Sequence, residues 1–124
     1  AKERIRMLCD ACKNLQGDIV LVGASLGGYV SLAAASLLHA KGVFLMAPSI
    51  YMPDLPPLRE GIVDCPVSVV HGWNDTVVPV QNSIRFAREH NAMLHVVNTD
   101  HRMHDQLPFI RYLFEYFIIS IDLG

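Results

Sequence analysis

The sequence has little charge, and no part of it is dominated by charge of one sign. Of its 124 residues, 18% are charged, with 10 Lys and Arg against 12 Asp and Glu. The formal net charge is -2, and no run of five like charges occurs, which argues against a nucleic-acid-binding face or an acidic tail. Hydrophobic residues make up 52% of the chain, too many for a disordered protein. Length and composition together predict one globular domain over residues 1–124.

Cysteine is scarce and odd in number. Cys9, Cys12 and Cys65 are too few for a disulfide scaffold, which favours a reducing compartment and predicts a cytoplasmic location. Cys9 and Cys12 form a C-x-x-C pair, but they fall inside an expected helix with no second pair to complete a zinc site. We therefore expect two small apolar side chains on a buried helix face, and no metal or organic cofactor.

Targeting and membrane segments are also missing from the pattern. The chain opens with Ala1-Lys2-Glu3-Arg4, and no apolar core of a secretory signal follows. Residues 19–38 carry no charge and are long enough to cross a bilayer. Their character changes midway, however, from a β-branched run through glycines to an Ala- and Leu-rich stretch. A strand, a turn and a helix explain this order better than one membrane span does.

The chain alternates between patterns typical of strands and of helices. Expected helices cover 2–14, 26–39, 79–90 and 105–119; expected strands cover 18–24, 43–47, 67–70 and 93–97; a proline-containing loop covers 49–64. The first two strands have no polar face, which is typical of parallel strands buried on both sides. Buried strands alternating with helices predict an α/β fold, with a parallel sheet of about four strands flanked by helices.

A glycine-rich turn joins the first expected strand to the next helix. It reads Gly23-Ala24-Ser25-Leu26-Gly27, the G-x-S-x-G pattern of a serine nucleophile on a sharp strand-to-helix turn. Glycines at both flanks would avoid collisions with the neighbouring strand and helix. The N–H of Leu26 would face an oxyanion formed when Ser25 attacks a carbonyl. The alternative is a tight turn with an inert serine.

Two more polar residues follow later strands. Asp75 lies in the loop after the third expected strand, where a carboxylate could orient a histidine, although a loop Asp more often serves a turn or a helix cap. His101 follows the fourth strand and suits a general base, with His104 as its rival. Because the carboxyl ends of parallel strands meet at one edge, Ser25, Asp75 and His101 are expected to converge there. His101 and His104 have no third metal ligand at a matching spacing.

Candidate pocket residues follow the same strands. Met46 lies near the end of the second expected strand, Tyr51 lies in the loop after it, and Trp73 precedes Asp75 by two positions. These three side chains are expected either to shape an acyl pocket or to pack in the core and loops.

These motifs resemble those of the α/β-hydrolase family, most closely its lid-free esterases and thioesterases. The resemblance rests on the turn around Ser25, on residues 69–75 followed by Val78-Pro79, and on Asp100-His101. In that family Ser, Asp and His form a catalytic triad in this chain order. The resemblance therefore implies Ser25 as nucleophile, Asp75 as the acid and His101 as the base. It covers the chain from about residue 18 onward, and the segment 49–66 is too short for a full cap domain.

One part of the family pattern has no counterpart in this sequence. Family members carry an N-terminal half of the sheet, with a loop that supplies the second oxyanion donor. Residues 1–17 match only the helix before the nucleophile strand, so we expect the domain to be incomplete at its N-terminus. The strand at 18–24 would then be an open apolar edge, prone to self-association or to pairing with the missing segment.

The expected function is hydrolysis of a small-molecule carboxylic ester or thioester through an acyl-enzyme intermediate. The alternative is a catalytically silent hydrolase-like domain used for binding or assembly. A flavodoxin-like or redox domain fits less well because the sequence has no phosphate-binding loop.

Overall fold

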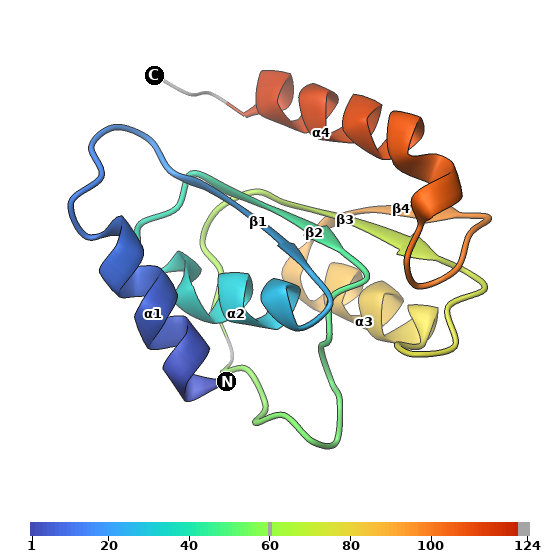
Figure 1. The fold of residues 1–124 in the computed structure, drawn as a ribbon, viewed down its shortest axis with the longest axis horizontal. Helices are drawn as coiled ribbons and strands as arrows, with labels where there is room; N and C mark the ends of the chain where they lie inside the picture. The colour runs from blue at the N-terminus through green and yellow to red at the C-terminus, as the bar shows by residue number, and fades with distance from the viewer. Residues whose placement is uncertain (60, 122–124) are drawn as a thin grey trace.

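The computed structural model describes residues 1–59 and 61–121, and it contains one parallel sheet in which the strands follow chain order. The strands are β1 (Val20–Ala24), β2 (Gly42–Met46), β3 (Val67–Gly72) and β4 (Met93–Val97). The helices are α1 (Lys2–Cys12), α2 (Leu26–Ala35), α3 (Val80–His90) and α4 (Leu107–Ser120), with a short 3-10 helix, η1 (His104–Gln106), before α4. The helices α2 and α3 cover one face of the sheet, with α1 beside α2 on the same side, and α4 covers the opposite face (Figure 1). The predicted α/β fold is confirmed.

Burial separates the central strands from the edge strands. Nearly every residue of β2 and β3 is buried, as the apolar sequence predicts. In β1 the burial alternates, and Val22 is 48% exposed. The expectation that this strand is buried on both faces is wrong, because α4 packs over β2 and β3 and reaches Val20 of β1 but leaves Val22 exposed.

Several element boundaries differ from the sequence prediction. The strand β1 begins at Val20, α1 ends at Cys12, and α2 ends at Ala35 before a turn that reaches His39. The strand β3 continues to Gly72, which places His71 inside the sheet. The described part of the segment 49–64 has no helix or strand, as expected.

The helix α1 lies farther from the core than its sequence pattern indicates. None of its residues is buried. Cys9 and Cys12 are half-buried free thiols rather than members of a buried face. The physical reason is that α1 packs on α2 and not on the sheet.

Two apolar clusters hold the layers together. Between the sheet and the helices α2 and α3, the cluster includes Leu32, Leu45, Val69 and Phe86. On the other face, Phe44 of β2 packs edge-on against Phe114, with ring centroids 5.3 Å apart, and against Phe117 at 6.0 Å. Leu107, the first residue of α4, is 53% exposed. No described helix is long and apolar enough to cross a membrane.

Candidate active site

Ser25 occupies the sharp turn between β1 and α2. Its backbone has φ 53° and ψ -122°, a region that non-glycine residues rarely occupy and that costs energy. Three backbone hydrogen bonds hold it there. The Ser25 N–H donates to the carbonyl of Met46 at 3.0 Å, and the Ser25 carbonyl accepts from Gly28 at 3.0 Å and from Ser49 at 2.9 Å. The nucleophile candidate is thus tied to the end of β2.

The glycines around this turn have different steric roles. A Cβ at Gly23 would overlap the carbonyl group of Gly27 and lie 2.7 Å from Ser31 Oγ, so glycine is required there. At Gly27 the expected collision is not found, since no atom of the described residues lies within 4 Å of the corresponding Cβ position. The second close approach is at Gly28, whose Cβ would lie 2.7 Å from Pro48 Cβ. The steric argument for Gly27 is therefore wrong, and it applies to Gly28 instead.

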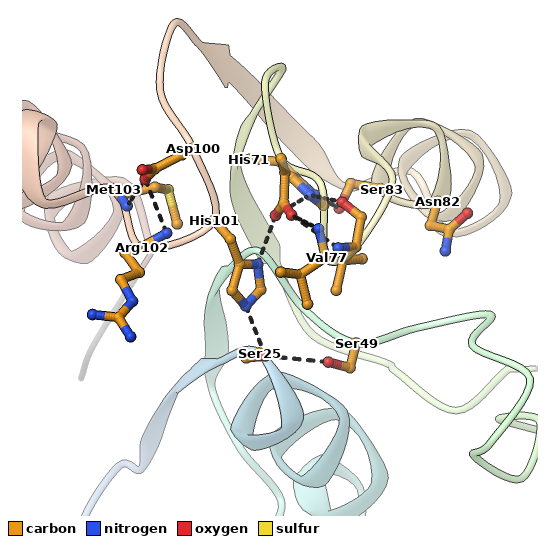
Figure 2. Close-up of polar contacts among 12 residues, drawn as sticks. Ser25, Ser49, His71, Val77, Asn82, Ser83, Asp100, His101, Arg102 and Met103 are labelled. Carbon is orange, nitrogen blue, oxygen red and sulfur yellow. Dashed lines mark hydrogen bonds and ion pairs between the residues drawn. The ribbon is translucent and has the colours of Figure 1, made fainter.

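Ser25, His101 and Asp75 form a continuous hydrogen-bonded chain. Ser25 Oγ lies 3.1 Å from His101 Nε2 (Figure 2). His101 Nδ1 lies 2.7 Å from Asp75 Oδ2. An ionised Asp75 only accepts, so His101 carries its proton on Nδ1 and accepts from the Ser25 hydroxyl at Nε2. The His101 side chain is 20% exposed and that of Asp75 is fully buried. This arrangement can move the Ser25 proton to His101.

Backbone and side-chain donors keep Asp75 ionised although it is buried. Burial alone would raise the pKa of Asp75, but hydrogen bonds from His101 and from the N–H groups of Val78 and Val77 outweigh it and lower the pKa. Both backbone donors bind Oδ1 at 2.8 Å. Asp75 Oδ2 is left for His101 and for one further donor. The carboxylate is therefore held in one orientation.

That further donor is His71, a residue to which sequence reasoning assigned no role. His71 is fully buried at the end of β3, and its Nε2 lies 3.1 Å from Asp75 Oδ2. Its Nδ1 lies 2.7 Å from Ser83 Oγ, on α3. The spacing of four positions between His71 and Asp75 was visible in the sequence, but nothing local indicates that the loop folds back.

Ser49 is a second residue that the sequence did not identify. Its Oγ lies 3.4 Å from Ser25 Oγ (Figure 2). Since the Ser25 hydroxyl donates to His101, Ser49 would be the donor in this contact. Leu26 is the first residue of α2, so its N–H has no acceptor within the helix and is free to meet an oxyanion at Ser25.

A cavity of about 260 Å³ lies beside Ser25 and His101. Met46 also lines this cavity. The other lining residues are Ala24, Arg102, Met103, His104, Leu107 and Ile110. His104 therefore faces the same cavity, but it is His101 that contacts Ser25.

The two other candidate pocket residues lie elsewhere. Tyr51 lines a separate cavity of about 430 Å³, under the proline-containing loop, and that cavity includes neither Ser25 nor His101. Trp73 is 55% exposed. Among residues 1–59 and 61–121, no group of three or more His, Cys, Asp or Glu side chains is placed to bind a metal.

No protein-family model and no curated protein sequence matches the chain. Solved structures do. A protein of the alpha/beta hydrolase superfamily from Xanthomonas campestris pv. campestris matches with a TM-score of 0.88 and 28% identity, over 97% of this chain and 69% of that one. Est1E from Butyrivibrio proteoclasticus matches with a TM-score of 0.78 and 22% identity, over 94% of this chain and 67% of that one. Mouse alpha/beta hydrolase domain-containing protein 10 matches with a TM-score of 0.69 and 21% identity, over 92% of this chain and 67% of that one.

This chain thus spans about two thirds of the length of these three proteins. Its match lies in the C-terminal part of the larger chains, as the resemblance of the motifs predicted. By its fold, the chain is similar to the C-terminal part of α/β-hydrolase superfamily structures.

Proposed function

We propose that this chain supplies the nucleophile, base and acid of a serine hydrolase that cleaves small-molecule carboxylic esters or thioesters. The observation that carries the proposal is the continuous contact from Ser25 Oγ through His101 to the buried carboxylate of Asp75. A serine in a turn with no catalytic role needs neither a histidine at 3.1 Å nor a buried acid behind that histidine. The hydrolase fold of the chain is consistent with this activity.

The geometry suggests the following steps. His101 Nε2 takes the proton of Ser25, and Ser25 Oγ attacks the carbonyl carbon of the substrate. The N–H of Leu26 donates to the oxyanion of the tetrahedral intermediate. His101 then gives its proton to the leaving alcohol or thiol, and the acyl group stays on Ser25. A water molecule, deprotonated by His101, releases the carboxylic acid and restores the serine.

The cavity beside Ser25 suggests where the acyl group binds. Met46, Leu107 and Ile110 give its wall an apolar surface, which suits a small acyl chain. Tyr51 and Trp73 lie outside this wall, so we assign the acyl contact to Met46 among the three candidates. A cytoplasmic location remains a prediction from the cysteine content alone.

A fluorophosphonate probe tests the proposal, because it reacts with activated serines and not with ordinary ones. Intact mass spectrometry of the 124-residue protein should show a single adduct, and peptide mapping should place it on Ser25. Ser25→Ala should abolish the adduct, while Ser49→Ala, the matched change at the neighbouring hydroxyl, should retain it. His101→Ala should slow labelling by about 10²-fold or more, and His104→Ala should change it little.

Two results would contradict these assignments. An adduct that persists in Ser25→Ala would remove Ser25 as nucleophile, and a larger loss in His104→Ala than in His101→Ala would move the base to His104. No adduct on wild-type protein with a native circular-dichroism spectrum would favour the alternative, a catalytically silent domain used for binding or assembly.

A further inference from the structure

His71 is the buried titratable side chain that the proposed mechanism does not use. It is the fifth residue of β3, and none of its surface is exposed. An imidazole is costly to bury unless both ring nitrogens are hydrogen-bonded. The contacts of these two nitrogens therefore indicate what the ring does.

The partners of His71 determine where its proton lies. Nε2 faces two acceptors, the carbonyl oxygen of Val78 at 2.9 Å and Asp75 Oδ2 at 3.1 Å. A nitrogen between two acceptors must be a donor, so Nε2 carries the proton. Nδ1 is 2.7 Å from Ser83 Oγ (Figure 2) and accepts from that hydroxyl. Burial lowers the pKa of His71. This effect of burial outweighs the contacts with Val78 and Asp75, which raise the pKa, and it favours the neutral ring.

We propose that His71 is a positioning residue of the Ser25–His101–Asp75 site: its Nε2–H donates to the same carboxylate oxygen that accepts the Nδ1–H of His101. The proposal rests on the proposed function. Asp75 Oδ1 is held by two backbone N–H groups, and His71 fixes the second oxygen. Ser83, on α3, in turn fixes the tautomer of His71. The carboxylate therefore faces His101 in a fixed orientation.

Because two donors share Asp75 Oδ2, this carboxylate oxygen also affects how readily His101 is protonated. Each donor withdraws electron density from Asp75 Oδ2, so the carboxylate stabilises a protonated His101 less than it would alone. Removing the His71 donor should therefore favour the imidazolium form of His101. Arg102 and His104 line the cavity at His101. Both residues, and the residue at position 25, are the same in all proteins whose His101 titrations are compared below, so their influence is common to all of them.

The first test uses the unaltered protein and needs no activity. Nitrogen-15 NMR of the histidine rings distinguishes the two neutral tautomers from the doubly protonated form. We expect His71 to be neutral and protonated on Nε2 throughout the neutral pH range. A neutral ring protonated on Nδ1 would overturn the proposal, because Nε2 would then have no proton to donate to Asp75. A doubly protonated ring would also overturn it, because Nδ1 could then not accept from Ser83 and the proposed control of the tautomer would be lost.

The second test compares two variants of nearly equal shape. Gln at position 71 places an N–H donor near the position of Nε2, whereas Met fills similar space without a donor. The ring of His101 is titrated by NMR in Ser25→Ala protein, with and without His71→Gln or His71→Met. We expect His71→Met to move the midpoint upward by roughly half to one pH unit, and His71→Gln to stay close to the parent.

A role of His71 in packing alone predicts a different outcome. Both substitutions would then lower the stability, and neither would move the His101 midpoint. Equal midpoints in folded His71→Met and His71→Gln protein would overturn the proposal. Because both NMR tests are independent of labelling, they can succeed even if the fluorophosphonate experiment fails, and the two proposals remain distinguishable.

Discussion

Asp75 shows how one residue can be both buried and charged. Its side chain has no exposed surface, yet it accepts hydrogen bonds from two backbone N–H groups and two histidine rings. A buried carboxylate needs this many donors because it has lost all of its hydration. His71 has the opposite requirement, since it is buried as a neutral ring. Protonation at either residue therefore opposes folding.

Acid should destabilise this protein in two separate pH ranges. The folded pKa of His71 is below its usual 6.5, so the unfolded chain binds that proton first and stability falls as the pH drops below about 6.5. The folded pKa of Asp75 is below its usual 3.8. The stability that Asp75 contributes is thus complete above that value and is lost as the pH falls through the folded pKa.

Urea unfolding at pH 7.5, 6.5 and 5.5 measures the first range. The free energy of unfolding should decrease with a slope of up to about 1.4 kcal/mol per pH unit for each proton. His71→Gln should flatten this slope, whereas the same change at the exposed His104 should leave it unaltered. His95, whose pKa burial also lowers, is present in every protein compared. An unchanged slope in His71→Gln would contradict the prediction, because His71 would then bind the same number of protons in the folded and the unfolded state.

At the scale of the element, the junction of β1 and α2 has the strictest steric requirements. The chain reverses at Ser25, and Gly23 and Gly28 allow the helix to pass close to the strand and to Pro48. The N-terminus of α2 then points its free N–H groups toward the site. The loops after β3 and β4 face this junction because all four strands are parallel.

Alanine substitutions at Gly23 and Gly27 should show which of these two motif glycines is required for steric reasons. Gly23→Ala should lower the free energy of unfolding by about 1–3 kcal/mol, because a methyl group there must displace backbone of α2. Gly27→Ala should be neutral or stabilising by up to about 1 kcal/mol, because the site is open and alanine favours the helix. Chemical denaturation measures both. Equal losses in the two variants would mean that Gly27 is also sterically constrained.

At the scale of the whole molecule, the two faces and the two edges of the described sheet differ in how well other elements cover them. Contacts with α4 cover Phe44 and Val70 of the central strands, while Val22 of β1 is half-exposed. No described strand pairs with the outer edge of β1. Such an edge presents unpaired backbone groups beside an apolar surface, a combination that promotes pairing between chains.

We therefore expect the 124-residue chain to self-associate through β1. Sedimentation velocity should show an average mass that rises with protein concentration. Val22→Lys should reduce this association, because a lysine on an edge strand opposes pairing. The matched change Leu37→Lys, at a residue that is 64% exposed in the turn after α2, should leave it intact. A monomer at all concentrations would contradict the prediction, as would equal effects of the two lysines.

The sequence alone determined the order of the elements and the turn at Ser25. Apolar runs, helical periodicity and glycines are local properties, and they act over a few residues. They were sufficient to predict four parallel strands and the loops that carry Ser25, Asp75 and His101. The strand ends were less accurate, since pairing in the sheet extends β3 to Gly72 and shortens β1.

Only the tertiary structure decided which side chains meet. Ser25 and His101 are 76 positions apart, and the sequence favours His101 over His104 only by its place in the loop after the fourth strand. His71 and His101 both contact Asp75 Oδ2, which requires the loops after β3 and β4 to meet, and the need for glycine at position 28 depends on Pro48 beside it. The exposed face of β1 depends on where α4 lies. Each of these features arises from packing between distant segments, and for that reason a local pattern could not predict it.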